Sequence, residues 1–410
     1  MPDSSVPMDL KSPKAACAFR IVEKLNNAGF QALFAGGCVR DHLLGAIPTD
    51  YDIATSATPD EVEELFSKTI PVGKQFGVML VLLDTFQFEV ATFRTEGGYQ
   101  DGRRPGFVKF ANAEEDARRR DFTVNGLFCD PREKDFSKQI KDYVGGQLDL
   151  DKQIIRCIGN PSERFEEDKL RLLRAVRFAA RLDFQIESDT WAEIKKRATQ
   201  INVVSKERIR DELEKIVNSP HIYLGLKLMT ESGLWQAIFS NVDPAVILRL
   251  ENAPSAFGGV PFIFAVLFQG QNVAVEDLMR GLRFSNHDIT STTRLLGLVE
   301  SFMQFSELRE GKQKQILGNP DFNRALGVYK LTLNKPKVYD ALQSKKDLWK
   351  GENLHPDPFV FGDDLIRLGV APGPQMGKWI EEAYLLQLEG VLSDKSAAED
   401  WVRSQHKNKK

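Results

Sequence analysis

The chain has 410 residues, which is too long for one compact core, so roughly two to four domains are expected. Hydrophobic residues make up 42% of it and charged residues 28%, as in an ordinary soluble protein. No apolar run approaches the length of a membrane span, and the N-terminus lacks a charged-then-apolar signal pattern, so a membrane protein is not expected. The net charge of −3 does not by itself predict nucleic-acid binding.

The cysteines indicate the cellular compartment of the protein, and the local clusters of charge indicate what kind of partner it binds. The cysteines have no metal-like spacing, which together with the missing signal favours reduced thiols and a cytoplasmic protein. Basic residues gather in short runs such as Arg118–Arg120 and Arg171–Arg181. A basic stripe on an acidic body suits a phosphate-backbone ligand, although a solvated helix face explains any single run equally well. The four cysteines are Cys17, Cys38, Cys129 and Cys157.

Residues 1–150 have the mixed pattern of an α+β domain. An amphipathic helix is expected around Cys17–Leu25, and Thr58–Glu61 has the capping residue, the proline and the early acids of a helix start. Asp142–Asp149 is expected to be a loop that closes the domain. Strands are expected at Val78–Leu83, Phe86–Phe93 and Val108–Phe110.

Beyond residue 150, strand signals become rare and helical periodicity dominates. From about residue 236 the helical pattern continues to the end of the chain, interrupted by prolines. The predicted fold is therefore an α+β head, with a mixed sheet and flanking helices, followed by an all-α array. We place the domains at residues 1–150, 151–235 and 236–410. The first helices of the array are expected at Arg164–Arg181, Ser188–Ala198, Ser205–Val217 and Ile222–Glu231.

A pair of acids follows a double-glycine turn near the start of the head. An apolar strand leads through Gly36 and Gly37 into a helix, and a second strand is expected to carry Asp50 and Asp52. Alternate strand residues point to one face, so the two carboxylates lie side by side and repel unless a cation separates them. Carboxylates suit Mg²⁺ that also holds phosphate oxygens, and glycines let the backbone approach a triphosphate. This motif predicts phosphoryl or nucleotidyl transfer.

Two later segments of the head carry further candidates. Glu89 lies on a predicted strand among apolar neighbours and could complete a metal site, although an exposed glutamate on an edge strand is the alternative. Arg119 belongs to an arginine triplet, and the arginine fork binds phosphate oxygens bidentately. Asp121 would orient one of these arginines, and Asn125 offers both a donor and an acceptor to a sugar.

The predicted helix Arg164–Arg181 repeats charged residues at every third position. Each such step drifts by about 60° at about 100° per residue. Asp168 and Arg171 are therefore close neighbours, Arg174 sits further round, and Arg177 lies nearly opposite Asp168. A salt-bridged surface helix would account for this spacing. The sharper interpretation is that Asp168 and Arg171 form a paired acceptor and donor edge for a nucleobase.

Six motifs occur in the order known from one family. They are Gly36–Asp41, Asp50–Asp52, Phe88–Arg94, Arg118–Asn125, Tyr143–Gly146 and Arg164–Phe184. With these motifs the chain resembles the class II tRNA nucleotidyltransferase/poly(A) polymerase family, above all the bacterial CCA-adding enzymes. The resemblance is dense over residues 30–220 and thin beyond them. It implies a catalytic head, a helical neck that selects the nucleobase, and a helical body and tail that bind tRNA.

The resemblance also implies residue roles at the matching positions. The implied magnesium ligands are Asp50 and Asp52. The implied nucleotide contacts are Gly37, Arg40 and Arg119. The implied protein template for C or A is formed by Asp168 and Arg171, with Arg174 and Arg177 nearby on nucleotide phosphate or tRNA.

The reaction implied by the resemblance is template-independent transfer of CMP and AMP from CTP and ATP to the 3′ end of tRNA, with release of pyrophosphate. The glycine-containing segment Thr95–Pro105 favours full CCA addition, because the family has a flexible element near this position that switches the pocket from C to A. Enzymes that add only A, only CC or poly(A) remain alternatives. A non-catalytic RNA-binding protein is a further alternative, which the repulsive pair Asp50 and Asp52 disfavours. No pattern in the sequence sets an oligomeric state.

Overall fold

The computed structural model of the protein describes residues 10–97, 107–253 and 258–407. It divides into two compact units, Met1–Pro244 (unit 1) and Ala245–Lys410 (unit 2). The predicted α+β head and the helical array after it are confirmed, whereas the domain boundaries at residues 150 and 235 stay a prediction. Across the described ranges, no helix is long and apolar enough to cross a membrane. Most of the segment Thr95–Pro105, from residue 98 on, lies outside the described residues.

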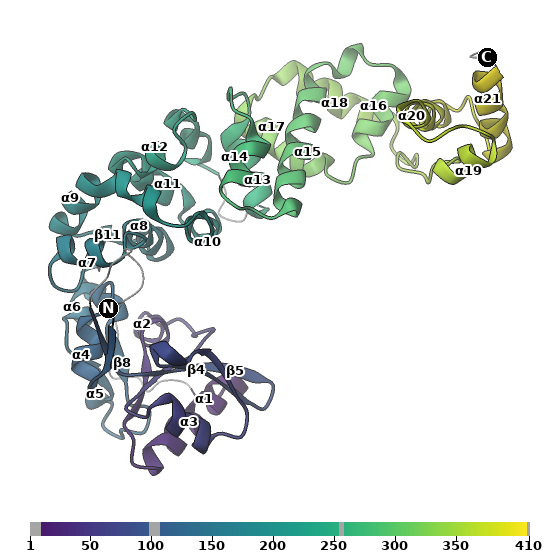
Figure 1. Cartoon of the computed structure of the whole chain (residues 1–410). Coiled ribbons are helices and arrows are strands. Elements are labelled where there is room, and N and C mark those ends of the chain that lie inside the picture. Colours follow the sequence, from purple (N-terminus) through teal and green to yellow (C-terminus); the bar gives the residue numbers. More distant parts are fainter. Residues whose placement is uncertain (1–9, 98–106, 254–257, 408–410) are drawn as a thin grey trace. The chain divides into compact units, whose positions relative to one another are not determined.

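A mixed sheet forms the centre of the head (Figure 1). In the described part of the chain its strand order is β3-β4-β5-β2-β1-β8-β9, in which β2 and β5 run parallel and the other neighbours antiparallel. Its strands are β1 (Ala32–Ala35), β2 (Asp52–Thr55), β3 (Thr69–Gly73), β4 (Val78–Leu83), β5 (Phe86–Thr92), β8 (Leu127–Cys129) and β9 (Ile140–Asp142). Two small sheets pair β6 (Arg94–Gly97) with β7 (Phe107–Phe110) and β10 (Ile154–Ile155) with β11 (Gln185–Ile186).

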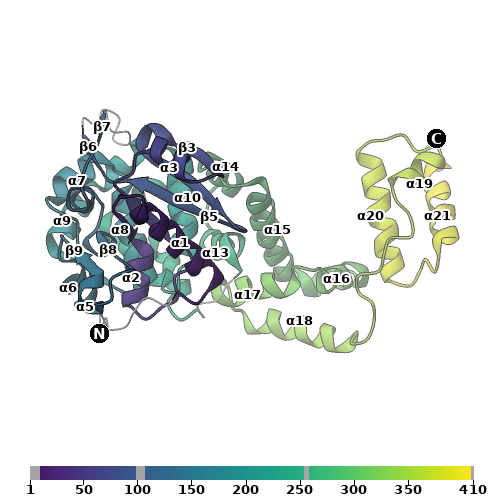
Figure 2. The ribbon, with the colours of Figure 1, turned by 90° about the horizontal axis from the view of Figure 1, so that it is seen from below.

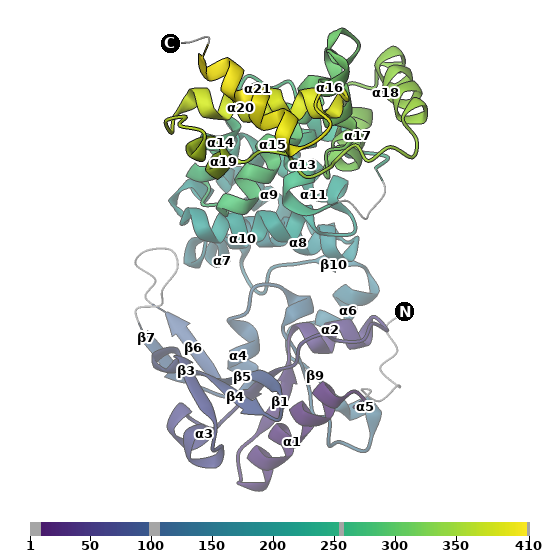
Figure 3. The same cartoon turned by 90° about the vertical axis from the view of Figure 1, so that its right-hand side faces the viewer.

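Helices pack on this sheet because its strands bury apolar residues. α1 (Pro13–Asn27) and α3 (Pro59–Leu65) lie together beneath it in Figures 1 and 3. Thr58 caps α3 as the sequence predicts, and the side chain of Glu61 accepts a hydrogen bond from the Thr58 amide in return. On the central strands, Leu33, Ala35 and Ala54 pack against α4 (Ala113–Arg118). The remaining short helices of the head are α2 (Gly37–Leu43), η1 (Lys74–Phe76), η2 (Thr123–Asn125), α5 (Phe136–Gln139) and α6 (Gly146–Asp151).

The segment predicted as one helix over Arg164–Arg181 is two helices, so that prediction was wrong. Asp168 lies between them with an extended backbone (φ −147°, ψ 105°). Its carboxylate accepts a hydrogen bond from the amide of Leu170 at 3.0 Å, which is the local turn by which aspartate competes with a continuing helix. The helices of this part are α7 (Pro161–Glu167), α8 (Arg171–Leu182), α9 (Ser188–Arg197), η3 (Ala198–Val203), α10 (Lys206–Val217), α11 (Ile222–Ser232) and α12 (Leu234–Ile238). Figure 3 shows α7, α8 and α10 as one layer.

Unit 2 is helical throughout its described residues. α13 (Gly259–Phe268) is buried along its whole apolar length. α19 (Gly362–Arg367), α20 (Pro374–Leu388) and α21 (Lys395–Lys407) lie together (Figure 2) and share an apolar cluster around Trp379. Arg309, which precedes α16, donates to Glu389 after α20 at 2.6 Å. The helices are η4 (Pro244–Leu250), α13 (Gly259–Phe268), α14 (Val275–Gly281), α15 (Asn286–Met303), η5 (Phe305–Glu307), α16 (Glu310–Leu317), α17 (Phe322–Thr332), α18 (Pro336–Leu348), α19 (Gly362–Arg367), α20 (Pro374–Leu388) and α21 (Lys395–Lys407).

Candidate functional site

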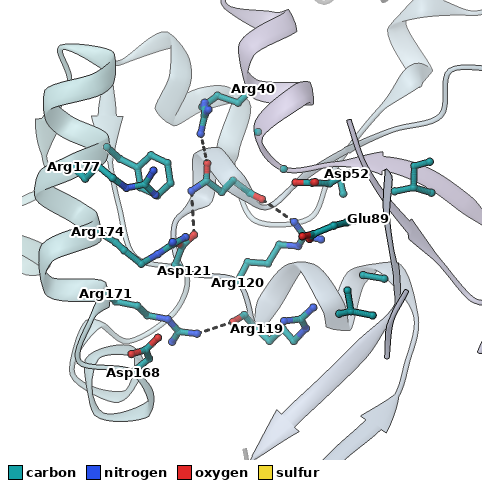
Figure 4. A pocket seen from close by; sticks show the side chains of 18 of the residues that line it. Arg40, Asp52, Glu89, Arg119, Arg120, Asp121, Asp168, Arg171, Arg174 and Arg177 are labelled. Carbon is teal, nitrogen blue, oxygen red and sulfur yellow. Dashed lines mark hydrogen bonds and ion pairs between the residues drawn. The ribbon is translucent and has the colours of Figure 1, made fainter. Parts of the chain in front are cut away.

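A cavity of about 520 Å³ in unit 1 is lined by residues of the central strands, η2 and α8 (Figure 4). Of the residues singled out in the sequence, all except Asp50 line it. These are Gly36, Gly37, Arg40, Asp52, Glu89, Arg119, Asp121, Asn125, Asp168, Arg171, Arg174 and Arg177. The sequence analysis did not single out Arg94, Arg120, Phe178 and Arg181, which also line it. All the described lining residues together include eight arginines and four acids, and this excess of positive charge favours an anionic ligand.

Asp52 and Glu89 form the acidic wall of the cavity. Ile53 is paired with Val90 in parallel strands, which makes the preceding residues, Asp52 and Glu89, neighbours. Asp52 is open to the cavity and enclosed by protein on its other sides. Desolvation there, together with the charge of Glu89, raises the pKa of Asp52 to about 6, against the opposing effect of Arg120. The acidic wall therefore lacks full charge compensation by the protein.

Asp50 does not line the cavity, although its charge acts on Asp52. β2 begins at Asp52, so the expectation that both aspartates sit on one strand was wrong. The Asp50 side chain is 80% exposed and accepts a hydrogen bond from Lys14 Nζ of α1 at 2.5 Å. Within the described ranges, no three acidic, histidine or cysteine side chains are grouped closely enough to hold a metal ion. A metal shared by both aspartates would compete with Lys14 for Oδ1 of Asp50.

A buried hydrogen-bonded chain links α2 to α8 through η2 (Figure 4). Arg40, which is 2% exposed, donates from Nη1 to Asn125 Oδ1 at 2.6 Å, and Asn125 Nδ2 donates to Asp121 Oδ1 at 3.1 Å. Arg174 Nε donates to Asp121 Oδ2 at 2.9 Å. Burial opposes the charged form of Asp121, but Arg174 and Asn125 hold its pKa well below the usual range. These residues fix the shape of the cavity wall.

The arginine triplet is organised by Asp116, which the sequence analysis did not identify. Arg119 Nε donates to Asp116 Oδ1 at 2.8 Å and Arg120 Nη2 to Asp116 Oδ2 at 3.0 Å. Although burial disfavours its charged form, these two arginines keep the pKa of Asp116 below normal. The signal was present in the sequence, because Asp116 precedes the two arginines by three and four positions, the spacing typical of ion pairs at a helix.

The wall formed by α8 is built around Phe178. The guanidinium of Arg177 lies 4.0 Å from its ring centroid, and those of Arg174 and Arg40 lie 5.4 Å from it, which favours cation–π attraction. Arg177 is also ion-paired with the buried Glu212 of α10 at 2.6 Å. Burial lowers the pKa of Arg177 to about 10, and Glu212 opposes that shift. The predicted position of Arg177 opposite Asp168 was wrong because the two residues do not share a helix.

Asp168 and Arg171 both line the cavity but have different partners. Arg171 Nη1 donates to Glu167 Oε2 at 2.6 Å and to the carbonyl of Arg164 at 3.0 Å. Asp168 instead accepts from Arg208 of α10, at 3.1 and 2.7 Å. The predicted i,i+3 adjacency of Asp168 and Arg171 on one helix was therefore wrong, although both face the same space.

Comparison with protein families defines the class. Residues 32–156 match the family described as "Poly A polymerase head domain". Residues 183–246 match one described as "Probable RNA and SrmB- binding site of polymerase A". The head, its acidic wall and its arginine-rich cavity are those of a nucleotidyltransferase, a class that generally uses a divalent metal.

Comparison with individual proteins narrows the class to one family. CCA-adding enzymes of Limosilactobacillus fermentum and Lactobacillus gasseri are each 34% identical over 390 residues, covering 91% and 93% of this chain and 92% and 95% of theirs. The crystal structure of the Bacillus stearothermophilus CCA-adding enzyme in complex with CTP has a TM-score of 0.75 at 27% identity, covering 97% of this chain and 99% of that one. The chain belongs to the CCA-adding enzyme family. The Thermotoga maritima CCA-adding enzyme complexed with tRNA shares the fold, with a TM-score of 0.64 at 20% identity over 96% of each chain.

Proposed function

We propose that this protein adds C and A residues to the 3′ end of tRNA without a nucleic-acid template, consuming CTP and ATP and releasing pyrophosphate in the cytoplasm. The observation that carries the proposal is one cavity in which an acidic wall faces arginines of α8 and of the Arg118–Arg120 triplet. Family membership supports the reaction, and the structures of relatives with CTP and with tRNA support the substrates. Positioning and charge stabilisation supply most of the acceleration in such transfers.

We assign a magnesium ion to Asp52 and Asp50, with Glu89 beside them. Carboxylate oxygens suit Mg²⁺, which proteins commonly hold through one or two carboxylates plus substrate phosphates, so the absence of a three-residue cluster in the described residues is no obstacle. The raised pKa of Asp52 supports the fit, because a cation would relieve the repulsion from Glu89. When bound, the ion would lower the pKa of the attacking hydroxyl and screen the triphosphate.

The remaining residues bind and select the nucleotide in this proposal. Arg119, Arg174 and Arg177 lie where triphosphate oxygens or tRNA phosphates can reach their guanidinium groups. Gly37 leaves room for the substrate, since a Cβ there would meet only Arg40 Nη2 within 4 Å, at 3.6 Å. Asp168 and Arg171 present an acceptor and donors to the base edge.

The metal assignment is tested with Asp52→Ala and Asp50→Ala. A tRNA transcript that ends before CCA is incubated with CTP, ATP and Mg²⁺, and extension is followed on a gel. We expect each variant to lose roughly a thousandfold in extension rate, because the metal contributes several kcal/mol, while tRNA affinity is retained.

Asp60→Ala serves as the matched control, because Asp60 is an exposed aspartate of the same domain that pairs with Lys74 at 2.8 Å. Its extension rate should equal that of the wild type. Turnover at the wild-type rate in Asp50→Ala or Asp52→Ala would remove that residue from the metal site.

A further inference from the structure

The carboxylate of Asp168 is fixed by its surroundings in the described part of the chain. Oδ1 accepts a hydrogen bond from the amide of Leu170 at 3.0 Å and one from Arg208 Nη1 at 3.1 Å. Oδ2 accepts one from Arg208 Nη2 at 2.7 Å. A local turn therefore holds one oxygen, and a two-point arginine contact sets the plane of the carboxylate.

Arg208 reaches Asp168 from a separate helix. It lies in the first turn of α10, 40 positions along the chain from Asp168, and its side chain is 22% exposed. Arg208 is not among the described residues that line the cavity, whereas Asp168 is. One turn further along α10, Glu212 pairs with Arg177, another lining residue. α10 thus contacts two side chains that line the cavity, Asp168 and Arg177, through residues that do not line it themselves.

We propose that Arg208 is a positioning residue that sets which nucleobases the site accepts, by fixing the orientation of the Asp168 carboxylate. This inference rests on the proposed function, in which Asp168 reads the base. Oδ1 receives two hydrogen bonds and Oδ2 receives one. Each carboxylate oxygen has about two acceptor sites, so Oδ2 keeps a site for the ligand at a defined angle.

A fixed acceptor oxygen separates the four bases into two groups. Cytosine and adenine carry an exocyclic amino group that donates to it, whereas uracil and guanine carry a carbonyl oxygen that it repels. Without Arg208, among the described residues only the amide of Leu170 restrains the rotation of the carboxylate about its last side-chain bond. The correctly directed hydrogen bond to C or A then weakens, while U and G gain nothing comparable. Arg208 therefore acts on selectivity without touching the substrate.

The first experiment measures kcat/KM for addition of one nucleotide to tRNA that ends before CCA, with CTP and with UTP. In Arg208→Met the CTP/UTP ratio should fall on the order of tenfold, the size expected for a charge-assisted hydrogen bond, mainly through a loss for CTP. Arg208→Lys keeps the charge but loses the two-point contact, so its CTP/UTP ratio should lie between those of the wild type and Arg208→Met. Arg210→Met is the matched control, because Arg210 lies on the same helix, pairs with Asp211 at 2.6 Å and does not line the described cavity. Its ratio should be unchanged.

The second experiment is a double-mutant cycle with Asp168→Asn. If Arg208 acts through Asp168, Arg208→Met changes the ratio by less than twofold in the Asp168→Asn background. A tenfold change in both backgrounds would overturn the proposal, as would a wild-type ratio in either folded Arg208 variant. Failure of the proposed function is a separate result, because the wild-type protein itself would then add neither nucleotide. Failure of the role of Arg208 alone would leave the wild type active.

Discussion

Two aspartates of the cavity differ in what surrounds their charge. Asp121 is buried against Arg174 and Asn125, which keep its pKa well below normal despite its burial. Asp52 is desolvated beside Glu89, and its pKa rises to about 6. Charge compensation for Asp121 is thus built into the protein, whereas we propose that Asp52 gains it from a bound cation. We therefore propose a structural role for Asp121 and a role in the chemistry for Asp52.

The ionised form of Asp121 contributes to folding stability. We expect Asp121→Asn to lower the free energy of unfolding at pH 7 by about 2–4 kcal/mol, because Arg174 loses its buried partner. The folded-state pKa of Asp121 is depressed, so its contribution is present above the unfolded-state pKa of about 3.9 and is lost as the pH falls further. Urea unfolding at pH 7 and pH 3 measures this. An equal loss at both pH values would contradict the account.

The opposite sign applies to Asp52. Its folded-state pKa is raised, so stability falls as the pH rises from about 3.9 to about 6 and stays lower above that range. Without divalent cations at pH 7, Asp52→Asn should therefore melt no lower than wild type, with a gain of at most about 1 kcal/mol, because the carboxylate faces open solvent in the cavity. Mg²⁺ should raise the melting temperature of the wild type only. Equal Mg²⁺ stabilisation of both proteins, measured by thermal melting, would contradict the assignment.

At the scale of elements, local sequence patterns predicted strands such as β4 and β5 and helices such as α9 and α10, whereas contacts between distant segments were not predictable from them. Gly36, Glu89 and Arg174 lie in one cavity because β1 and β5 formed as expected and because residues 171–181 are helical in α8, although the predicted helix is broken before it. The break at Asp168 has a local turn, but the contact of Asp168 with Arg208, 40 positions along the chain, cannot be predicted from a local pattern. The pair of Asp50 with Lys14 is equally non-local.

The double-glycine turn before α2 offers a test at this scale. Gly36 has φ +68°, and a Cβ there would lie 3.1 Å from Arg120 Nη1, whereas Gly37 has no positive φ and no such close contact. Gly36→Ala should lower the free energy of unfolding by roughly 1–2 kcal/mol because a side chain is strained in this conformation. Gly37→Ala should change it by well under 1 kcal/mol. Urea unfolding of both variants compares them directly, and equal losses would contradict the geometry.

At the scale of the whole molecule, every described residue that lines the cavity belongs to unit 1. Unit 2 is helical in its described residues and is proposed to bind tRNA, through contacts to phosphates and shape rather than sequence. Nucleotide binding and tRNA binding should therefore be separable along the chain.

Removal of residues 245–410 tests this separation. The remaining chain should bind CTP within about threefold of the full protein, since its cavity is complete. Its affinity for tRNA should fall at least about tenfold, with a weaker dependence on salt because fewer phosphate contacts remain. Calorimetry with CTP and filter binding with tRNA at two salt concentrations measure both. Loss of CTP binding in a folded truncated protein would contradict the division of roles.

We propose that this cavity adds C, C and A in order and then stops. The direct measurement uses three tRNA transcripts, which end before CCA, after C and after CC, each incubated with CTP and ATP together and separately and then sequenced. The account predicts that the first two are completed to CCA only when both nucleotides are present, and that the third gains one A from ATP alone. Products that stop at CC, acceptance of the third transcript only, or long A tails would contradict it.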